Sequence, residues 1–535
     1  MRLHLYRHLN SKLIYVNLRT EVADKNFKNR GNVRLWPSMV LFVVSAAAVV
    51  WVRAQTEWPF QHRNLLIAQI SLVFVILLLL WWTFFSRASN RLRLGITYGS
   101  VGLLLVAALL FRFSGVSGDL VPIFEFRWAN RSFPTIQPVR LDAPAITLAA
   151  TNDFPQFRGP NRDGILAGPN LETNWTAHPP QIIWRQNVGA AWSGFAVVGQ
   201  ICLTQEQRGE KECVVARELA SGKELWLHSD RARFNNIVAG EGPRATPTVV
   251  SNRVFTCGST GILNCLDLAT GNIIWMRDVR MGGKVPDWGV ASSPLCVEDL
   301  VIVHGGEGAR NSLHAFRADN GQPVWSGGIM DPGYASPAFA TLAGTPQILA
   351  FNDGAVSSHD LATGAMLWQR PWGNGNAVCT SPVIVNENQV LFSSGYGVGA
   401  ELLEISRTNS RFVATPLWKS IRMKAKFSHM FARDGFLYGL DDGIFACVDL
   451  KNGSQRWKEG RYGHGQGLLV GELYLLMAES GELVLLHPTP DAPNELARFR
   501  VFDSKTWNPI ALAGDFLLVR NDREAALLKL ALVTK

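Results

Sequence analysis

The chain has 535 residues, of which 47% are hydrophobic, so it is long enough for several domains or a repeat array and is not a disordered protein. Its formal net charge of +9 does not indicate a nucleic-acid groove, because eight of its Lys and Arg residues lie within positions 1–35, directly before an apolar region.

Three apolar runs follow this basic tail, at residues 36–52, 65–85 and 94–111. Each run approaches or reaches the roughly 20 residues that a helix needs to cross a membrane. No acidic or basic residue lies in any of the three runs, so nothing in them indicates a proton relay or a transport path. We therefore expect three transmembrane α-helices over residues 36–111 that serve as a membrane anchor.

The distribution of arginine predicts the orientation of this anchor. The short second loop carries Arg87, Arg91 and Arg93, whereas the longer first loop mixes two arginines with an acidic residue. Because positive loops stay in the cytoplasm, we expect residues 1–35 to be a cytoplasmic tail, and the chain after residue 111 to lie in the periplasm, outside a bacterial inner membrane. A cleaved signal peptide is a poor alternative, because three apolar runs occur and the first begins about 35 residues into the chain.

Residues 112–152 contain scattered proline and charge but no repeat, which predicts a linker. The domain that we expect over residues 153–535 opens with Asp153–Gly164, where aromatic residues, turn formers and charges are closely mixed. This composition predicts a structured loop that packs on one face of the domain.

The segment Leu263–Trp275 is the clearest copy of a unit that recurs along this domain. It is typical of two antiparallel strands joined by a tight turn, because Gly271 can adopt the positive φ that the turn needs. Asp267 can accept hydrogen bonds from the amides of the turn. The corresponding aromatic positions are Trp184, Trp226, Trp275, Trp325, Trp368, Trp418 and Trp457, with Phe499 in an eighth place.

These positions recur at intervals of about 40 to 50 residues, which is the size of a four-stranded propeller blade. Trp184 has no half-repeat before it and Ala526–Leu530 has no Trp strand after it, so we expect these two strands to complete one blade. The prediction is an all-β propeller of eight blades closed by strands from both its ends. Seven blades are the alternative if the weak copy at Trp418 belongs to an insertion. The charged cluster Arg520–Glu524 predicts a salt-linked turn at the closure, with anion binding as the alternative.

The strand that opens each repeat should lie nearest the propeller axis, so the segments leading into these strands should ring one mouth of the central funnel. They are rich in aromatic, hydrogen-bonding and glycine residues, as a small-molecule or peptide pocket requires. The alternative is that their Ser/Thr-Pro pairs only end the strand ladder. The candidate binding residues are Trp192, Arg244, Trp288, Tyr334, Asn376, His429, Tyr462, His464, Gln466, Trp507 and Asn508.

His464 stands out among these candidates, because the surrounding glycines leave its backbone open to close approach by a ligand. A purely structural histidine is the alternative, and no Asp or Cys at a suitable spacing completes a catalytic triad. The seven cysteines form no CxxC pair and no cluster with zinc spacing, so no metal site is assigned. They are either small buried side chains or, for Cys202 with Cys213 and Cys257 with Cys265, pairs across hairpins.

The Asp-x-x-(Thr/Asn/Ser)-Gly-x-x-x-Trp units of residues 153–535 closely resemble those of the pyrroloquinoline-quinone (PQQ) repeat propellers. That group contains the quinoprotein alcohol and glucose dehydrogenases and the assembly lipoprotein BamB, which has the repeats without the cofactor. The opening Phe157–Gly164 is also similar to that of membrane-anchored PQQ-like propellers of planctomycete-type bacteria. The resemblance is specific for fold and weakly specific for function.

The resemblance implies two functions. The first is a BamB-like scaffold in the cell envelope, which binds a protein or an envelope ligand at the propeller face. The alternative is a quinoprotein dehydrogenase that oxidises alcohols or sugars with PQQ and calcium and passes electrons to membrane quinone. The chain lacks the adjacent Cys-Cys pair of many such dehydrogenases, and no Glu/Asn/Asp set matches their calcium ligands. We therefore favour the scaffold, assign no catalytic residue and no cofactor, and keep PQQ with calcium as the alternative.

Overall fold

The structure is a computed structural model that describes residues 33–56, 58–129, 152–308, 311–328, 330–409 and 411–533. It divides into two compact units: Met1–Val116 with Leu120–Ala129, and Ser117–Asp119 with Asn130–Lys535. The predicted basic tail at residues 1–35 lies almost entirely outside the described residues, and so does the part of the predicted linker from residue 130 to 151.

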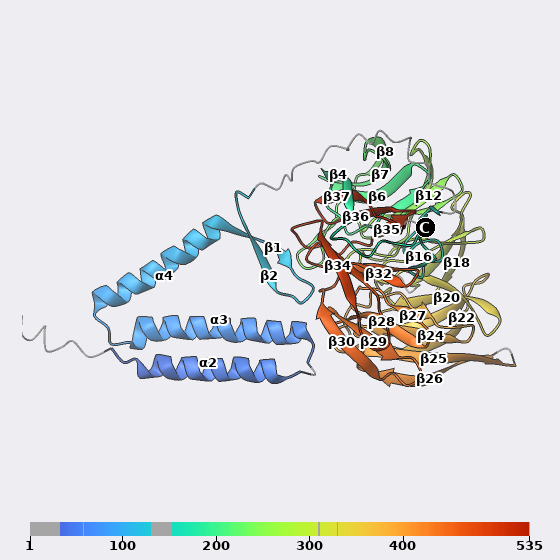
Figure 1. Cartoon of the computed structure of the whole chain (residues 1–535). Helices are drawn as coiled ribbons and strands as arrows, with labels where there is room; N and C mark the ends of the chain where they lie inside the picture. Colours follow the sequence, from blue (N-terminus) through green and yellow to red (C-terminus); the bar gives the residue numbers. More distant parts are fainter. Residues whose placement is uncertain are drawn as a thin grey trace, which may run out of the picture. The chain divides into compact units, whose positions relative to one another are not determined.

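The first unit contains the helices α2 (Trp36–Ala54), α3 (Phe60–Phe85) and α4 (Asn90–Leu110) (Figure 1). All three are long and apolar enough to cross a membrane. α3 and α4 begin several residues before the predicted runs and include Arg63, Arg91 and Arg93. Helical hydrogen bonding continues beyond the apolar part of a helix, whereas the apolar pattern marks only the part suited to hydrocarbon.

A hairpin of β1 (Phe111–Val116) and β2 (Pro122–Phe126) follows α4, within the segment where the sequence predicts a linker. Two cross-strand aromatic pairs stabilise it: Phe111 with Phe126 at 6.1 Å and Phe113 with Phe124 at 6.0 Å between ring centroids. Both strands belong to the first unit. The three residues Ser117–Asp119 between them belong to the propeller unit.

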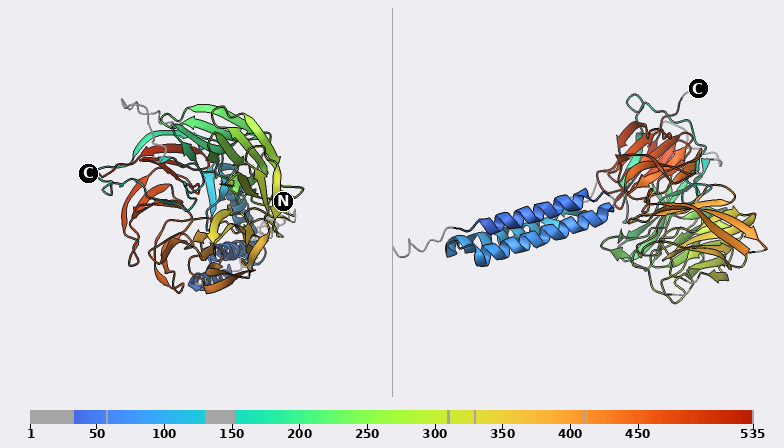
Figure 2. Two further views of the ribbon diagram at one scale, coloured as in Figure 1. Left: turned by 90° about the vertical axis from the view of Figure 1, so that its right-hand side faces the viewer. Right: turned by 90° about the horizontal axis from the view of Figure 1, so that it is seen from below.

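The described part of the second unit contains eight blades of four consecutively paired strands, numbered here along the chain (Figures 1 and 2). The strands of blades 1 to 4 are β5 (Ala196–Val198), β6 (Ile201–Arg208), β7 (Lys211–Glu218), β8 (Glu224–Asp230); β11 (Thr248–Val250), β12 (Arg253–Cys257), β13 (Ile262–Asp267), β14 (Ile273–Asp278); β15 (Leu295–Val297), β16 (Leu300–His304), β17 (Leu313–Arg317), β18 (Pro323–Gly327); and β19 (Ala338–Leu342), β20 (Thr345–Asn352), β21 (Ala355–Asp360), β22 (Met366–Pro371). A short pair, β9 (Asn235–Asn236) and β10 (Gly240–Glu241), lies between blades 1 and 2.

The strands of blades 5 to 8 are β23 (Val383–Ile384), β24 (Gln389–Ser394), β25 (Gly399–Thr408), β26 (Arg411–Ser420); β27 (Phe431–Arg433), β28 (Phe436–Asp441), β29 (Ile444–Asp449), β30 (Gln455–Arg461); β31 (Gln466–Val470), β32 (Leu473–Met477), β33 (Glu482–Leu486), β34 (Glu495–Arg500); and β35 (Ala511–Ala513), β36 (Phe516–Arg520), β37 (Glu524–Lys529), β4 (Gln181–Asn187).

Blade 8 joins strands from the two ends of the propeller, because β4 pairs with β37 and places Trp184 opposite Leu527. The predictions of eight blades and of this closure are confirmed. The Trp418 copy is the outer strand of blade 5, where the β25–β26 hairpin is long and the Thr-Gly turn is missing. This closure pairs the edge of β37 that would otherwise be exposed.

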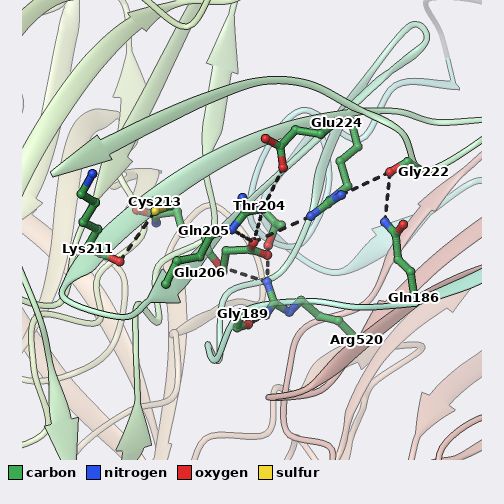
Figure 3. A network of polar contacts seen from close by, with 12 residues as sticks. Gln186, Gly189, Thr204, Gln205, Glu206, Lys211, Cys213, Gly222, Glu224 and Arg520 are labelled. Atoms are coloured by element: carbon green, nitrogen blue, oxygen red, sulfur yellow. Dashed lines mark hydrogen bonds and ion pairs between the residues drawn. The ribbon is translucent and has the colours of Figure 1, made fainter. Parts of the chain in front are cut away.

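A buried polar network holds this closure together (Figure 3). Arg520 of blade 8 is 1% exposed and reaches into blade 1. Its guanidinium donates to Thr204 Oγ1 at 2.8 Å, to the Gln205 carbonyl at 2.9 Å and to the Gly189 carbonyl at 2.8 Å. Burial lowers the pKa of Arg520 to about 10, against the attraction of Glu206, so the side chain is a cation at neutral pH. The charged cluster predicted at the closure therefore joins the two blades through this arginine.

The repeated tryptophans link neighbouring blades. In six of them the indole Nε1 donates, at 2.7 to 3.1 Å, to a backbone carbonyl in the turn before the outer strand of the next blade. The pairs of donor and acceptor residues are Trp184 with Leu219, Trp226 with Leu268, Trp275 with Ala318, Trp325 with Leu361, Trp418 with Leu450, and Trp457 with Thr489. Trp368 precedes blade 5, whose long hairpin has no such turn, and it bonds Gln347 of its own blade at 2.9 Å. Phe499 precedes blade 8, where two separate strands meet without a turn, so an indole donor would have no carbonyl to bond there.

The residues of the turn before the outer strand stabilise their own blade and also pack against the preceding blade. Asp267 Oδ1 accepts from the amides of Ala269 at 3.1 Å and Thr270 at 2.9 Å, which fixes the turn. Gly271 has a φ of 73°, and a Cβ at this position would overlap the ring of Trp226 in the preceding blade. Glycine is therefore needed here for its backbone conformation and for the close approach of the indole.

The loop that opens the domain packs against the inner strands of several blades. Phe154 bridges to Val197 of blade 1, and Arg162 donates to the carbonyls of Ser293 and Pro294 at 3.2 and 3.0 Å. The strand β3 (Ile165–Leu166) adds in parallel to the inner edge of β31. The loop thus contacts inner strands far apart around the ring.

All seven cysteines are free thiols; five are buried, and Cys296 and Cys379 are half-buried. The suggested pairs are offset along their hairpins, since Cys202 lies opposite Arg217 and Cys265 lies opposite Phe255. Burial raises the pKa of Cys202 to about 12, which keeps this thiol protonated. The structure favours the interpretation of these cysteines as small buried side chains.

Candidate functional site

Three of the predicted residues form one aromatic row at the propeller mouth, together with Phe427. The ring centroids of Trp192 and Trp507 lie 4.9 Å apart, those of Trp507 and Phe427 5.1 Å, and those of Phe427 and His464 5.4 Å. The row joins the segments that lead into blades 1, 8, 6 and 7. Lys505 lies across it, with Nζ 3.8 Å from the Trp507 ring and 4.9 Å from that of Trp192, as in a cation–π contact.

Trp288 and Tyr334 form a second aromatic pair, with ring centroids 5.3 Å apart. They belong to the segments that lead into blades 3 and 4. Burial raises the pKa of Tyr334 to about 12, so its hydroxyl remains a neutral hydrogen-bonding group. Both rings are half-buried, which leaves part of each ring able to contact a ligand.

Three other predicted residues brace the opening segments instead. Arg244 donates to the carbonyls of Ala239 and Gly240, both at 2.9 Å. Asn508 donates to the carbonyls of Ala191 and Ser193, in the segment leading into blade 1, at 3.0 and 2.8 Å. Gln466 donates to the carbonyl of Phe427, in the segment leading into blade 6, at 2.7 Å. Such bonds hold the segments of neighbouring blades in place, and thereby position the aromatic row.

The remaining three candidates lie apart from the aromatic row. Asn376 is exposed and donates to Asn374. Tyr462 packs in a hydrophobic cluster, and its hydroxyl donates to Glu495 at 2.7 Å. His429 is buried, with its ring 5.1 Å from that of Phe157 in the opening loop.

A charged group that the sequence does not indicate adjoins His464. Lys426 is 1% exposed, and its Nζ lies 3.4 Å from His464 Nε2. Burial lowers the pKa of Lys426 to about 8, although Asp119, Asp442 and Glu479 oppose this effect. The lysine is therefore mainly protonated at neutral pH.

Gly118 and Asp119 occupy this part of the mouth. The Gly118 amide donates to Glu479 Oε1 at 2.7 Å, and its carbonyl accepts from Lys426 Nζ. Asp119 Oδ1 lies 3.1 Å from His464 Nε2. Burial by itself would raise the pKa of Asp119, but His464 and the nearby cations lower it below its usual value.

Sequence reasoning identifies His464 but misses the residues that surround it. Lys426 directly precedes an opening segment, yet a lysine there is normally expected to face water. Glu479 lies in the turn between β32 and β33, and Gly118 is 308 positions away from Lys426 in the chain. Only the glycines around His464 signal that something approaches it closely.

The residues of the mouth do not fit the calcium that a quinone cofactor would require. The two carboxylate oxygens of Glu479 accept the amides of Gly118 and His464. Asp119 is bonded to His464 and Arg461. Among the described residues, no group of three or more His, Cys, Asp or Glu is placed to hold a metal ion. A calcium ion takes six to eight oxygen ligands, and these carboxylates already serve other partners.

Comparisons with known proteins agree with this architecture. The family described as "Outer membrane protein assembly factor BamB" matches residues 210–459. BamB of Shewanella oneidensis is 25% identical over 290 residues, covering 43% of this chain and 69% of that protein. BamB of Moranella endobia is 24% identical over 324 residues, covering 56% of this chain and 76% of that protein.

A solved structure with a similar fold is the quinohemoprotein alcohol dehydrogenase of Comamonas testosteroni, with a TM-score of 0.51 and 13% identity over 71% of this chain and 81% of that chain. At this identity the likeness shows the fold alone. The second unit of the protein is thus an eight-bladed β-propeller. Over residues 210–459 its sequence is similar to that of the BamB propellers.

Proposed function

We propose that the protein is a membrane-anchored scaffold of the cell envelope, which binds another protein or an envelope ligand at the mouth of its propeller. The observation that carries this proposal is the mouth itself, where the rings of Trp507, Trp288 and Tyr334 are half-buried and Lys505 Nζ lies 3.8 Å from the Trp507 ring. Aromatic side chains with a polar tip are enriched at binding surfaces. The BamB-type relatives support the proposal, since they are named as assembly factors for outer membrane proteins.

The proposed arrangement has residues 1–35 in the cytoplasm, residues 36–111 in the inner membrane, residues 112–152 as a connection and residues 153–535 in the periplasm. The three apolar helices and the arginines of the second loop support it. A reporter enzyme that folds only in the periplasm, fused after Lys535, should be active in intact cells. A fusion after Arg87 is the matched control and should be inactive. Activity of the second fusion alone would overturn the orientation.

Binding at the mouth is tested with a photo-crosslinking amino acid in the full-length protein in cells. At Trp288 it should give a discrete adduct with one envelope component. At Leu225, which is 50% exposed on the outer strand β8, it should give none. The substitution Trp507→Ala should reduce the Trp288 adduct by about tenfold, because it removes a large aromatic contact area next to Trp192.

The dehydrogenase alternative makes a different prediction, which would contradict the scaffold. The purified protein would bind PQQ stoichiometrically in the presence of calcium and would reduce a dye when given alcohols or sugars. The scaffold predicts neither saturable binding of the cofactor nor turnover.

A further inference from the structure

The backbone of Gly118 is held by side chains, as in a bound peptide. Its amide donates to Glu479 Oε1 at 2.7 Å, and its carbonyl accepts from the buried ammonium of Lys426. Glu479 also accepts the His464 amide at 2.9 Å through its second oxygen, which fixes the position of this carboxylate. Bonds from charged side chains to the amide and carbonyl of one residue are stronger than neutral ones, and they recognise a backbone of any sequence.

The carboxylate of Asp119 is held by an imidazole and a guanidinium group of the mouth. Oδ1 lies 3.1 Å from His464 Nε2, and Oδ2 lies 3.0 Å from Arg461 Nη1. His464 is 1% exposed, whereas Arg461 lies nearer to solvent. These two contacts favour an acidic side chain at this position, because a neutral one would lose the ion pair with Arg461 and the carboxylate contact to the buried His464 Nε2.

The His464 ring sets the size of the residue before the acid. A Cβ on Gly118 would overlap the Cδ2 and Cγ atoms of this ring. The ring is held between Phe427, at 5.4 Å, and Lys426 Nζ, 3.4 Å from its Nε2, so it has little room to move. Only glycine therefore fits against it without displacing the ring.

We propose that Lys426, Arg461, His464 and Glu479 form a peptide-binding site for a glycine followed by an acidic residue, which Gly118–Asp119 fills in cis until a partner segment displaces it. The inference rests on the proposed function and names the partner chemistry. The chain continues on both sides of Ser117–Asp119, so the segment is tethered at both ends. Tethering gives a cis ligand an effective concentration in the millimolar range, which a partner must overcome.

The test uses the full-length protein in detergent and a fluorescein-labelled peptide with the sequence of residues 115–120, Gly-Val-Ser-Gly-Asp-Leu. Gly118→Val should expel the cis segment, so this variant should bind the probe at least about tenfold more tightly than the wild type in fluorescence anisotropy. Asp119→Ala should give the same result by removing the carboxylate contacts to His464 and Arg461 without adding bulk. Gly102→Val is the matched control: a Cβ at Gly102 of α4 meets no neighbouring atom, and probe binding should equal that of the wild type.

A second probe, with Asn in place of Asp, should bind Gly118→Val about tenfold more weakly, the loss expected for one hydrogen bond to a charged group. Equal binding by the wild type and both variants, or no binding by any of them at millimolar probe, would overturn the cis-ligand proposal. If no variant binds the probe while crosslinking from Trp288 persists, the cis-ligand proposal is wrong and the proposed function stands. If PQQ supports turnover, the proposed function itself is wrong, whatever the probe does.

Discussion

Replacing Trp275 by alanine should lower the free energy of unfolding by roughly 3–5 kcal/mol, the usual range for a buried tryptophan. The indole is 6% exposed, and its Nε1 donates to the Ala318 carbonyl of the next blade at 3.1 Å. Its face covers Gly321 of that blade, where a Cβ would overlap the ring. The substitution thus removes packing on both sides of a blade junction and leaves a buried carbonyl without its donor.

Urea unfolding of the full-length protein in detergent, followed by the far-ultraviolet signal of the strands, measures this loss. Leu225→Ala, on an exposed outer strand, is the control and should cost less than about 1 kcal/mol. A decrease in the free energy of unfolding well below 1 kcal/mol for Trp275→Ala would mean that the repeated Trp and turn residues do not hold the blades together.

Replacing Arg520 by methionine should also lower the free energy of unfolding by roughly 3–5 kcal/mol, because it removes one member of a buried charge network. Methionine fills much of the volume but donates to none of the three oxygens that Arg520 bonds in Thr204, Gln205 and Gly189. Glu206, which is 0% exposed, also loses the attraction of one of its nearby cations.

The same urea titration checks this prediction, with Arg411→Met as the matched control, because Arg411 is exposed on β26. The control should change stability by less than about 0.5 kcal/mol. Limited proteolysis adds a local measurement. If blades 8 and 1 separate, β4 should be cleaved before the strands of the other blades. Equal stability of Arg520→Met and the wild type would show that strand pairing alone closes the ring.

Much of the propeller could be predicted because its information is local. Asp267, Gly271 and Trp275 lie within nine positions, and this spacing carries the turn geometry and the docking indole of one blade junction. Repetition of the unit then predicts the number of blades. It also predicts that the two incomplete repeats, at Trp184 and at Ala526–Leu530, pair in one blade. The exceptions follow the same physics, since Trp368 and Phe499 stand where the next blade offers no suitable turn carbonyl.

The mouth could be predicted only in part. The opening segments predict that Trp192, Trp288, Tyr334, His464 and Trp507 line the mouth, because the innermost strands of all blades should converge on the axis. The structure places the rings of Trp192 and Trp507 side by side and those of Trp288 and Tyr334 side by side, while His464 lies next to Phe427. They do not separate these residues from Tyr462, which has the same register but turns its side chain into the core. The direction of a side chain in an irregular segment depends on its neighbours in space, which periodicity does not encode.

The sequence by itself determined the three apolar helices, the eight blades and the strand that closes the ring, because each depends on patterns within one repeat or one helix. Only the tertiary structure showed which group contacts His464. The glycines around this histidine indicate close approach, but the group that approaches is Gly118, and it is held by Lys426 and Glu479 from different blades. Such a site exists only when the fold brings Gly118 into contact with Lys426, 308 positions away in the chain.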